Sequence, residues 1–100
     1  MILSFRLSMP NRGSWDGNWS GEGHKYIRTR SFRTKAEVAK AQKIVDKGSY
    51  HYSWPDGWGA NVRVEIINSK ESAKIRRKTD GFSGYDWMID SIIEHGVIKA

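Results

Sequence analysis

The stretch that decides the fold lies in the middle of the chain, where Thr34–Gly48 reads TKAEVAKAQKIVDKG. Thr34 and Glu37 fit a capping box, in which the Thr side chain accepts a first-turn N–H and Glu reaches back to the cap. Gly48 is a natural helix terminator because glycine adopts a positive φ without strain. The sequence therefore predicts a helix over residues 35–47. Its apolar stripe at helical spacing consists of Val38, Ala41, Ile44 and Val45.

Segments with strand character flank this helix in pairs. On the N-terminal side, Ile2–Ser8 alternates apolar with polar residues, and His24–Phe32 is rich in residues that favour strands. On the C-terminal side, Tyr50–Trp54 is followed by Asn61–Asn68, which has the clearest alternation in the chain. Stretches rich in turn-forming residues join the members of each pair, so we expect two hairpins.

The remainder of the chain favours two more helices. Ser69 is expected to cap a short basic helix over residues 70–78, whose core-facing residues are Ala73 and Ile75. Ser83 starts a second candidate capping box, before a helix that ends near His95. The apolar face of that helix consists of Tyr85, Met88, Ile89, Ile92 and Ile93. The last residues, 97–98, add either a short closing strand or a docked tail.

The resulting order is β-β-α-β-β-α-α. It predicts an α+β fold, a two-layer sandwich in which a four-stranded, mostly antiparallel sheet carries its helices on one face. One hundred residues is the usual size of one domain, so we expect residues 1–100 to form a single domain. Apolar residues make up 38% and charged residues 28% of the chain, which favours a folded globule over a disordered chain.

Composition excludes several classes of function. The chain has no Cys, so disulfides, thiolate nucleophiles, zinc–cysteine sites and iron–sulfur clusters are excluded. No apolar run approaches the ~20 residues of a membrane span, and the N-terminus lacks the pattern of a signal peptide. We therefore expect a cytoplasmic protein. The net charge of +6 favours nucleic acid, a phosphorylated ligand or an acidic protein as partner, although solubility alone explains a charge of this size.

Two loops that combine Trp with Gly are the most distinctive feature of the sequence. Residues 15–21 and 54–59 each place two Trp four positions apart around an Asp-containing turn and a Gly. Trp offers a flat face for stacking on bases or for cation–π contacts. The alternative is that these residues clamp their turns by cross-strand packing. One shared cleft requires both loops at the same end of the sheet, and a simple parallel crossover through the helix over 35–47 would separate them.

Basic residues form two candidate surfaces. If the apolar residues of Ile2–Ser8 point inward, Arg6 points outward, and the same outer face is assigned to Tyr26, Arg28, Arg30 and Arg63. Four Arg and one Tyr on one face suit phosphate contacts with some base stacking. The second surface is the cluster of Lys70, Lys74, Arg76, Arg77 and Lys78. For both surfaces the alternative is an ordinary solvated face.

Catalytic signatures are absent from the sequence. His24, His51 and His95 are isolated from any nucleophile motif. Asp86, Asp90 and Glu94 lie at successive turns along one helix edge, where a solvated polar face is a simpler explanation than a divalent ion. We therefore expect a protein that is not an enzyme, with no catalytic residue, no metal and no cofactor.

Three segments resemble parts of small uncharacterised proteins from phages and prophages. They are Met9–Trp15 together with Trp19–Gly21, then Asp56–Val62, and finally Gly81–Ile93, so that the resemblance covers nearly the whole chain. The resemblance implies expression inside a bacterial host cell and a phage accessory role, and it implies no activity. Small phage proteins of this size include inhibitors of host defence, such as anti-CRISPR proteins, which is an analogy of size and origin.

Two functions remain open at this point. The first is a non-enzymatic, phage-type accessory binding protein that recognises nucleic acid or a nucleotide-like ligand through the Trp–Gly loops and a basic surface. Its expected ligand-binding residues are Trp15, Trp19, Trp54, Trp58, Arg28, Arg30, Arg63, Arg76 and Arg77. The second is a protein-binding inhibitor of a host defence system, because Trp, Tyr and Arg are also favoured at protein interfaces.

Overall fold

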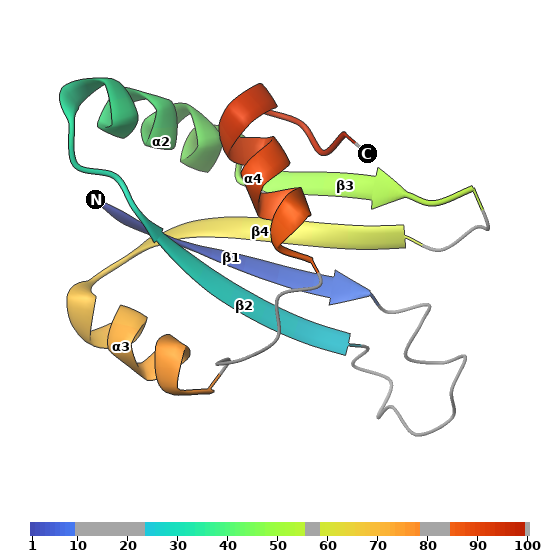
Figure 1. Ribbon diagram of the computed structural model, residues 1–100, viewed down its shortest axis with the longest axis horizontal. Coiled ribbons are helices and arrows are strands. Elements are labelled where there is room, and N and C mark those ends of the chain that lie inside the picture. Colours follow the sequence, from blue (N-terminus) through green and yellow to red (C-terminus); the bar gives the residue numbers. More distant parts are fainter. Residues whose placement is uncertain (10–23, 56–58, 79–84, 100) are drawn as a thin grey trace.

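Within residues 1–9, 24–55, 59–78 and 85–99, which the computed structural model describes, the chain forms four strands and three helices (Figure 1). The order is β-β-α-β-β-α-α, as predicted. The elements are β1 (Ile2–Met9), β2 (His24–Ser31), α2 (Lys35–Lys47), β3 (Ser49–Ser53), β4 (Gly59–Ile67), α3 (Ser69–Lys78) and α4 (Asp86–His95).

The four strands form one antiparallel sheet in the order β2-β1-β4-β3. In the central pair, Phe5 lies opposite Val64 and Leu7 lies opposite Val62. All four side chains are buried, so the clean alternation of β1 and β4 places one apolar row of each strand on the same face.

Helices α2 and α4 cover this apolar face, which confirms the predicted two-layer sandwich (Figure 1). Ala41 and Ile44 of α2 are buried, and Met88, Ile89 and Ile92 of α4 are fully buried. These residues belong to the apolar stripes expected from the sequence, because residues three and four positions apart share one side of a helix.

Helix α2 has the predicted boundaries. Thr34 Oγ1 accepts the Glu37 N–H at 3.1 Å, and Glu37 Oε1 accepts the Thr34 N–H at 3.0 Å. The N–H groups of Thr34 and Arg33 stabilise the charged carboxylate and lower the pKa of Glu37. At the other end Gly48 has a φ of 75°, which lets the chain turn directly into β3.

Helix α3 differs from the prediction in its cap and in its buried side. Asn68, not Ser69, is the N-cap, because Asn68 Oδ1 accepts the Glu71 N–H at 2.9 Å. Ser72 is buried whereas Ala73 is exposed. Ser72 Oγ lies 3.5 Å from Thr29 Oγ1 of β2, so α3 packs beside β2 on the side of the sheet that α2 and α4 leave open.

The end of the chain is a docked tail and not a closing strand. Ser91 Oγ donates to the Val97 carbonyl at 2.7 Å and accepts the Lys99 N–H at 2.8 Å. Gly96, with a φ of 73°, ends α4 and turns the chain toward Ser91. Tyr85 occupies the N-cap of α4, and its side chain makes no capping hydrogen bond to the first turn; Ser83 of the predicted capping box lies outside the described residues.

The cap of α3 can be tested by comparing two neighbouring substitutions. Asn68→Ala leaves the Glu71 N–H without its acceptor, so the free energy of unfolding should fall by about 1 kcal/mol. Ser69→Ala, at the first helical position, should be close to neutral. Urea unfolding followed by circular dichroism measures both. A larger loss for Ser69→Ala than for Asn68→Ala would contradict the assigned cap.

Candidate anion-binding face of the sheet

Both hairpin turns leave the sheet at the same end. At the end of β1, Met9 pairs with His24 of β2, and Ser53 of β3 pairs with Gly59 of β4. Because β1 runs antiparallel to β4, the Met9 end of β1 lies beside the Gly59 end of β4 (Figure 1). The edge strands β2 and β3 are antiparallel, so α2 joins them at the opposite end and makes no parallel crossover. The condition that would have separated the two Trp–Gly loops is therefore not met.

Of the four Trp residues expected to bind a ligand, the structure describes one. Trp54 is half-buried against the core, and its ring lies 5.0 Å from that of Tyr52, with the two planes 88° apart. This contact favours the packing alternative for Trp54. Trp15, Trp19 and Trp58 lie outside the described residues.

The arginines of β2 do not share a face with Arg6, contrary to the prediction. Arg28 lies opposite Phe5 and Arg30 lies opposite Leu3, so both belong to the face that carries the core. The assignment was wrong because β2 lies at the sheet edge, where a long side chain on the inner face can reach past the core to α4.

Two acidic residues of α4 bind these arginines. Arg28 Nε lies 3.4 Å from Asp86 Oδ1, and Arg30 Nη2 lies 3.3 Å from Asp90 Oδ1. The carboxylates that the sequence placed along one helix edge thus connect α4 to β2. Both arginines are structural ion-pair partners, which removes them from the set of available phosphate ligands.

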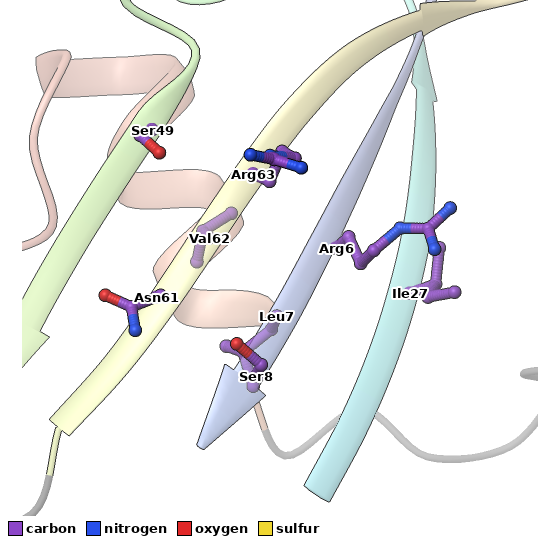
Figure 2. A pocket seen from close by; sticks show the side chains of 8 residues that line it. All are labelled: Arg6, Leu7, Ser8, Ile27, Ser49, Asn61, Val62 and Arg63. Atoms are coloured by element: carbon purple, nitrogen blue, oxygen red, sulfur yellow. The ribbon is translucent and has the colours of Figure 1, made fainter. Parts of the chain in front are cut away.

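Arg6 and Arg63 remain on the face that α2 and α4 do not cover. They occupy opposed positions in the pairing of β1 with β4, and both are exposed. Figure 2 shows the Arg6 side chain extending toward Ile27 of β2 and Arg63 on β4. Neither guanidinium forms a hydrogen bond or ion pair with another described residue. Like charges at directly opposed positions destabilise a sheet. Arg28 and Arg30 each have a carboxylate that offsets their charge, whereas Arg6 and Arg63 have none among the described residues.

Polar side chains surround the two arginines. Figure 2 shows Ser8, Ser49 and Asn61 on the same face, around a hollow of about 370 Å³ that Arg6 and Arg63 also line. Hydroxyl, amide and guanidinium groups are the side chains that contact phosphate and sugar oxygens in protein–nucleic acid complexes. The face is therefore suited to an anion with several oxygen atoms.

His51 belongs to the same surface and is held from both sides. Its Nδ1 lies 2.8 Å from Asn61 Oδ1, and its Nε2 lies 2.9 Å from Ser53 Oγ. An amide oxygen only accepts, so Nδ1 carries the proton in this contact, and in the neutral ring Nε2 accepts from the Ser53 hydroxyl. His51 thereby fixes the orientation of Asn61 at the rim of the hollow.

The sequence assigned Arg63 to this face but did not identify its polar neighbours. The alternation of the strands could have identified them, because Asn61 and Arg63 are two positions apart and so lie on one face, as do Ser8 and Arg6. The predicted basic cluster lies in α3, where Lys70 and Lys74 are exposed. The side chains of Arg76, Arg77 and Lys78 lie outside the described residues.

Within the described ranges, no group of three or more His, Asp or Glu side chains is arranged to hold a metal ion. None of the helices in those ranges is long and apolar enough to cross a membrane.

Repulsion between Arg6 and Arg63 predicts a gain in stability when one charge is removed. In protein freed of nucleic acid, Arg63→Thr should raise the free energy of unfolding by about 0.5 kcal/mol at low salt, and the gain should shrink as salt screens the pair. Arg63→Lys keeps the charge and is the matched control. Adding Arg6→Thr to Arg63→Thr should give no further gain from this pair, since the repulsion is already gone. Equal, additive gains from both Thr substitutions would contradict a repulsive pair.

No protein-family model, curated protein or solved structure matches this chain. The resemblance to phage and prophage proteins accordingly stays a prediction.

Proposed function

We propose that this chain is a non-enzymatic binding protein that recognises nucleic acid or a nucleotide-like ligand through the phosphate groups. The observation that carries the proposal is the opposed pair of Arg6 and Arg63, exposed and without an acidic partner among the described residues. A phosphate bound by both guanidinium groups would set two attractive interactions against the repulsion of two like charges on opposed strand positions. Arginine is well suited to this task because its planar fork of N–H donors matches phosphate oxygens.

The surroundings of the pair support a phosphate ester over a bare ion. The hollow of about 370 Å³ has room for more than one phosphate group, and it is lined by Ser8, Ser49 and Asn61 as well as by the arginines. Ile27 adds an apolar wall that a sugar or a base can contact. A net charge of +6 attracts polyanions over longer distances.

The topology supports a contribution from the Trp–Gly loops. The segment that contains Trp15 and Trp19 and the segment that contains Trp58 each follow one strand end and precede another, and these strand ends lie at the end of the sheet where Ser8 and Asn61 lie. Stacking on a base would complement phosphate contacts made on the adjacent face. In this proposal Arg6 joins Arg63 in the ligand set, while Arg28 and Arg30 leave it. A phage accessory role in a bacterial host cell belongs to the proposal through the sequence resemblance alone.

The salt dependence of oligonucleotide binding tests the proposal. The native chain should bind a fluorescein-labelled single-stranded oligonucleotide, with an affinity that falls as salt rises because counterions are released. The double substitution Arg6→Gln with Arg63→Gln should weaken binding and reduce the slope of log K against log salt by roughly 1.4, the value for two lost phosphate contacts. Fluorescence anisotropy at several salt concentrations gives both quantities.

A matched control separates a site from bulk charge. Lys40→Gln with Lys43→Gln removes the same two charges from α2, on the other side of the sheet, and should leave most of the affinity. Equal losses in the two double variants would show that net charge alone drives binding. Absence of binding at low salt would rule the proposal out. A partner that copurifies from bacterial lysate after nuclease digestion would favour the protein-binding alternative instead.

A further inference from the structure

A second hollow, of about 550 Å³, lies on the helix-covered side of the sheet between the end of β3 and α4. Tyr52 belongs to the face of β3 that also carries the buried Tyr50, whereas Ser49 and His51 belong to the open face. The hollow is therefore separate from the surface of Arg6 and Arg63. Its lining combines three aromatic side chains, Tyr52, Trp54 and Trp87, with two carboxylates, those of Asp90 and Glu94.

The two Trp rings stand nearly at right angles to the ring of Tyr52. Trp54 lies 5.0 Å from Tyr52 with an interplanar angle of 88°, and Trp87 lies 5.3 Å from Tyr52 with an angle of 87°. All three residues are half-buried and pack against the core, so the core holds them in place while each residue stays partly accessible. Aromatic faces carry a negative partial charge, which attracts cations.

The carboxylates add charge of the same sign. Asp90 and Glu94 lie one turn apart on α4 and both line the hollow. Asp90 is paired with Arg30 at 3.3 Å, but Glu94 has His95 as its nearest basic partner, at 3.9 Å, and that contact carries a charge only when the ring is protonated. Lys99 supplies one basic group at the rim. The aromatic faces, together with Glu94 as the carboxylate that is not paired with an arginine, favour a cation over the phosphate expected on the open face.

We infer that this hollow, the Tyr52–Trp54–Trp87 pocket, binds an alkylated ammonium group. A bare ammonium is strongly hydrated and would lose its water without gaining matching acceptors from the rings. A methylated ammonium is less hydrated and presents apolar methyl groups to the aromatic faces while its charge interacts with the rings and with Glu94. The inference is independent of phosphate binding on the open face.

Titration with choline against its neutral isostere, in which a carbon atom replaces the charged nitrogen, tests the inference. Choline should shift the indole N–H signals of Trp54 and Trp87 in NMR spectra, and the isostere should bind roughly tenfold more weakly because it lacks the cation–π term. Equal binding of the two compounds would show that the hollow is merely apolar and would overturn the inference. Absence of any shift with choline at millimolar concentration would also overturn it.

Substitutions of Glu94 and Trp87 then test whether each side chain contributes to choline binding. Glu94→Gln should weaken choline binding roughly two- to fivefold, and Glu65→Gln, an equal change on the open face, should have no effect. Trp87→Leu should lower the affinity roughly tenfold. If Trp87→Leu does not fold, the substitution of the exposed Glu94 still tests the inference. Choline binding by Glu94→Gln that equals choline binding by the Glu65→Gln control would contradict it.

Two sources of the ligand can be distinguished with the same assay. Choline represents a free small molecule, and the amide of trimethyllysine represents a modified side chain of a protein. Tighter binding of the first identifies a small-molecule site, and tighter binding of the second identifies a peptide-binding site. Both results support the inference, and failure of both compounds to bind overturns it without affecting the proposal for Arg6 and Arg63.

Discussion

The pairing of β1 with β4 is the contact on which the rest of the structure depends. It joins the two hairpins and places Phe5 opposite Val64 in the centre of the core. A slip of one residue would move a whole row of apolar side chains from the helix side to the solvent side, so the core fixes this register strongly. The same register sets Arg6 opposite Arg63 on the other face. The core and the candidate anion site are thus two consequences of one alignment.

The direction of these central strands also determines where the hairpin turns lie. Since β1 and β4 are antiparallel and each forms a hairpin with an outer strand, both turns fall at one end of the sheet. Helix α2 then connects the two outer strands at the other end, where its capping box and Gly48 set its length. The strand ends that flank the two Trp–Gly segments therefore lie at the same end of the sheet as Ser8 and Asn61 of the polar face.

Local signals account for the parts of the structure that the sequence predicts. The boundaries of α2 depend on Thr34, Glu37 and Gly48, which act within one or two turns, and the prediction was correct to the residue. The strand order, in contrast, depends on which edges of the two hairpins meet, and nothing local encodes that choice. The face of Arg28 was assigned wrongly because its partner, Asp86, is distant in sequence. In a hydropathy pattern, an arginine in an ion pair on the inner face looks the same as an arginine exposed to solvent.

The sheet contains two pairs of arginines whose acidic partners differ. On β2, Arg28 and Arg30 each have a carboxylate of α4 within 3.4 Å. On β1 and β4, Arg6 and Arg63 occupy opposed positions in the strand pairing, and the described part of the chain provides no such carboxylate. A partly exposed ion pair contributes at most about 1 kcal/mol, so the fold does not require either pattern for stability. One pair of arginines has its anions within the chain, and the other has none in the described residues, which is the basis for proposing that Arg6 and Arg63 bind an external anion.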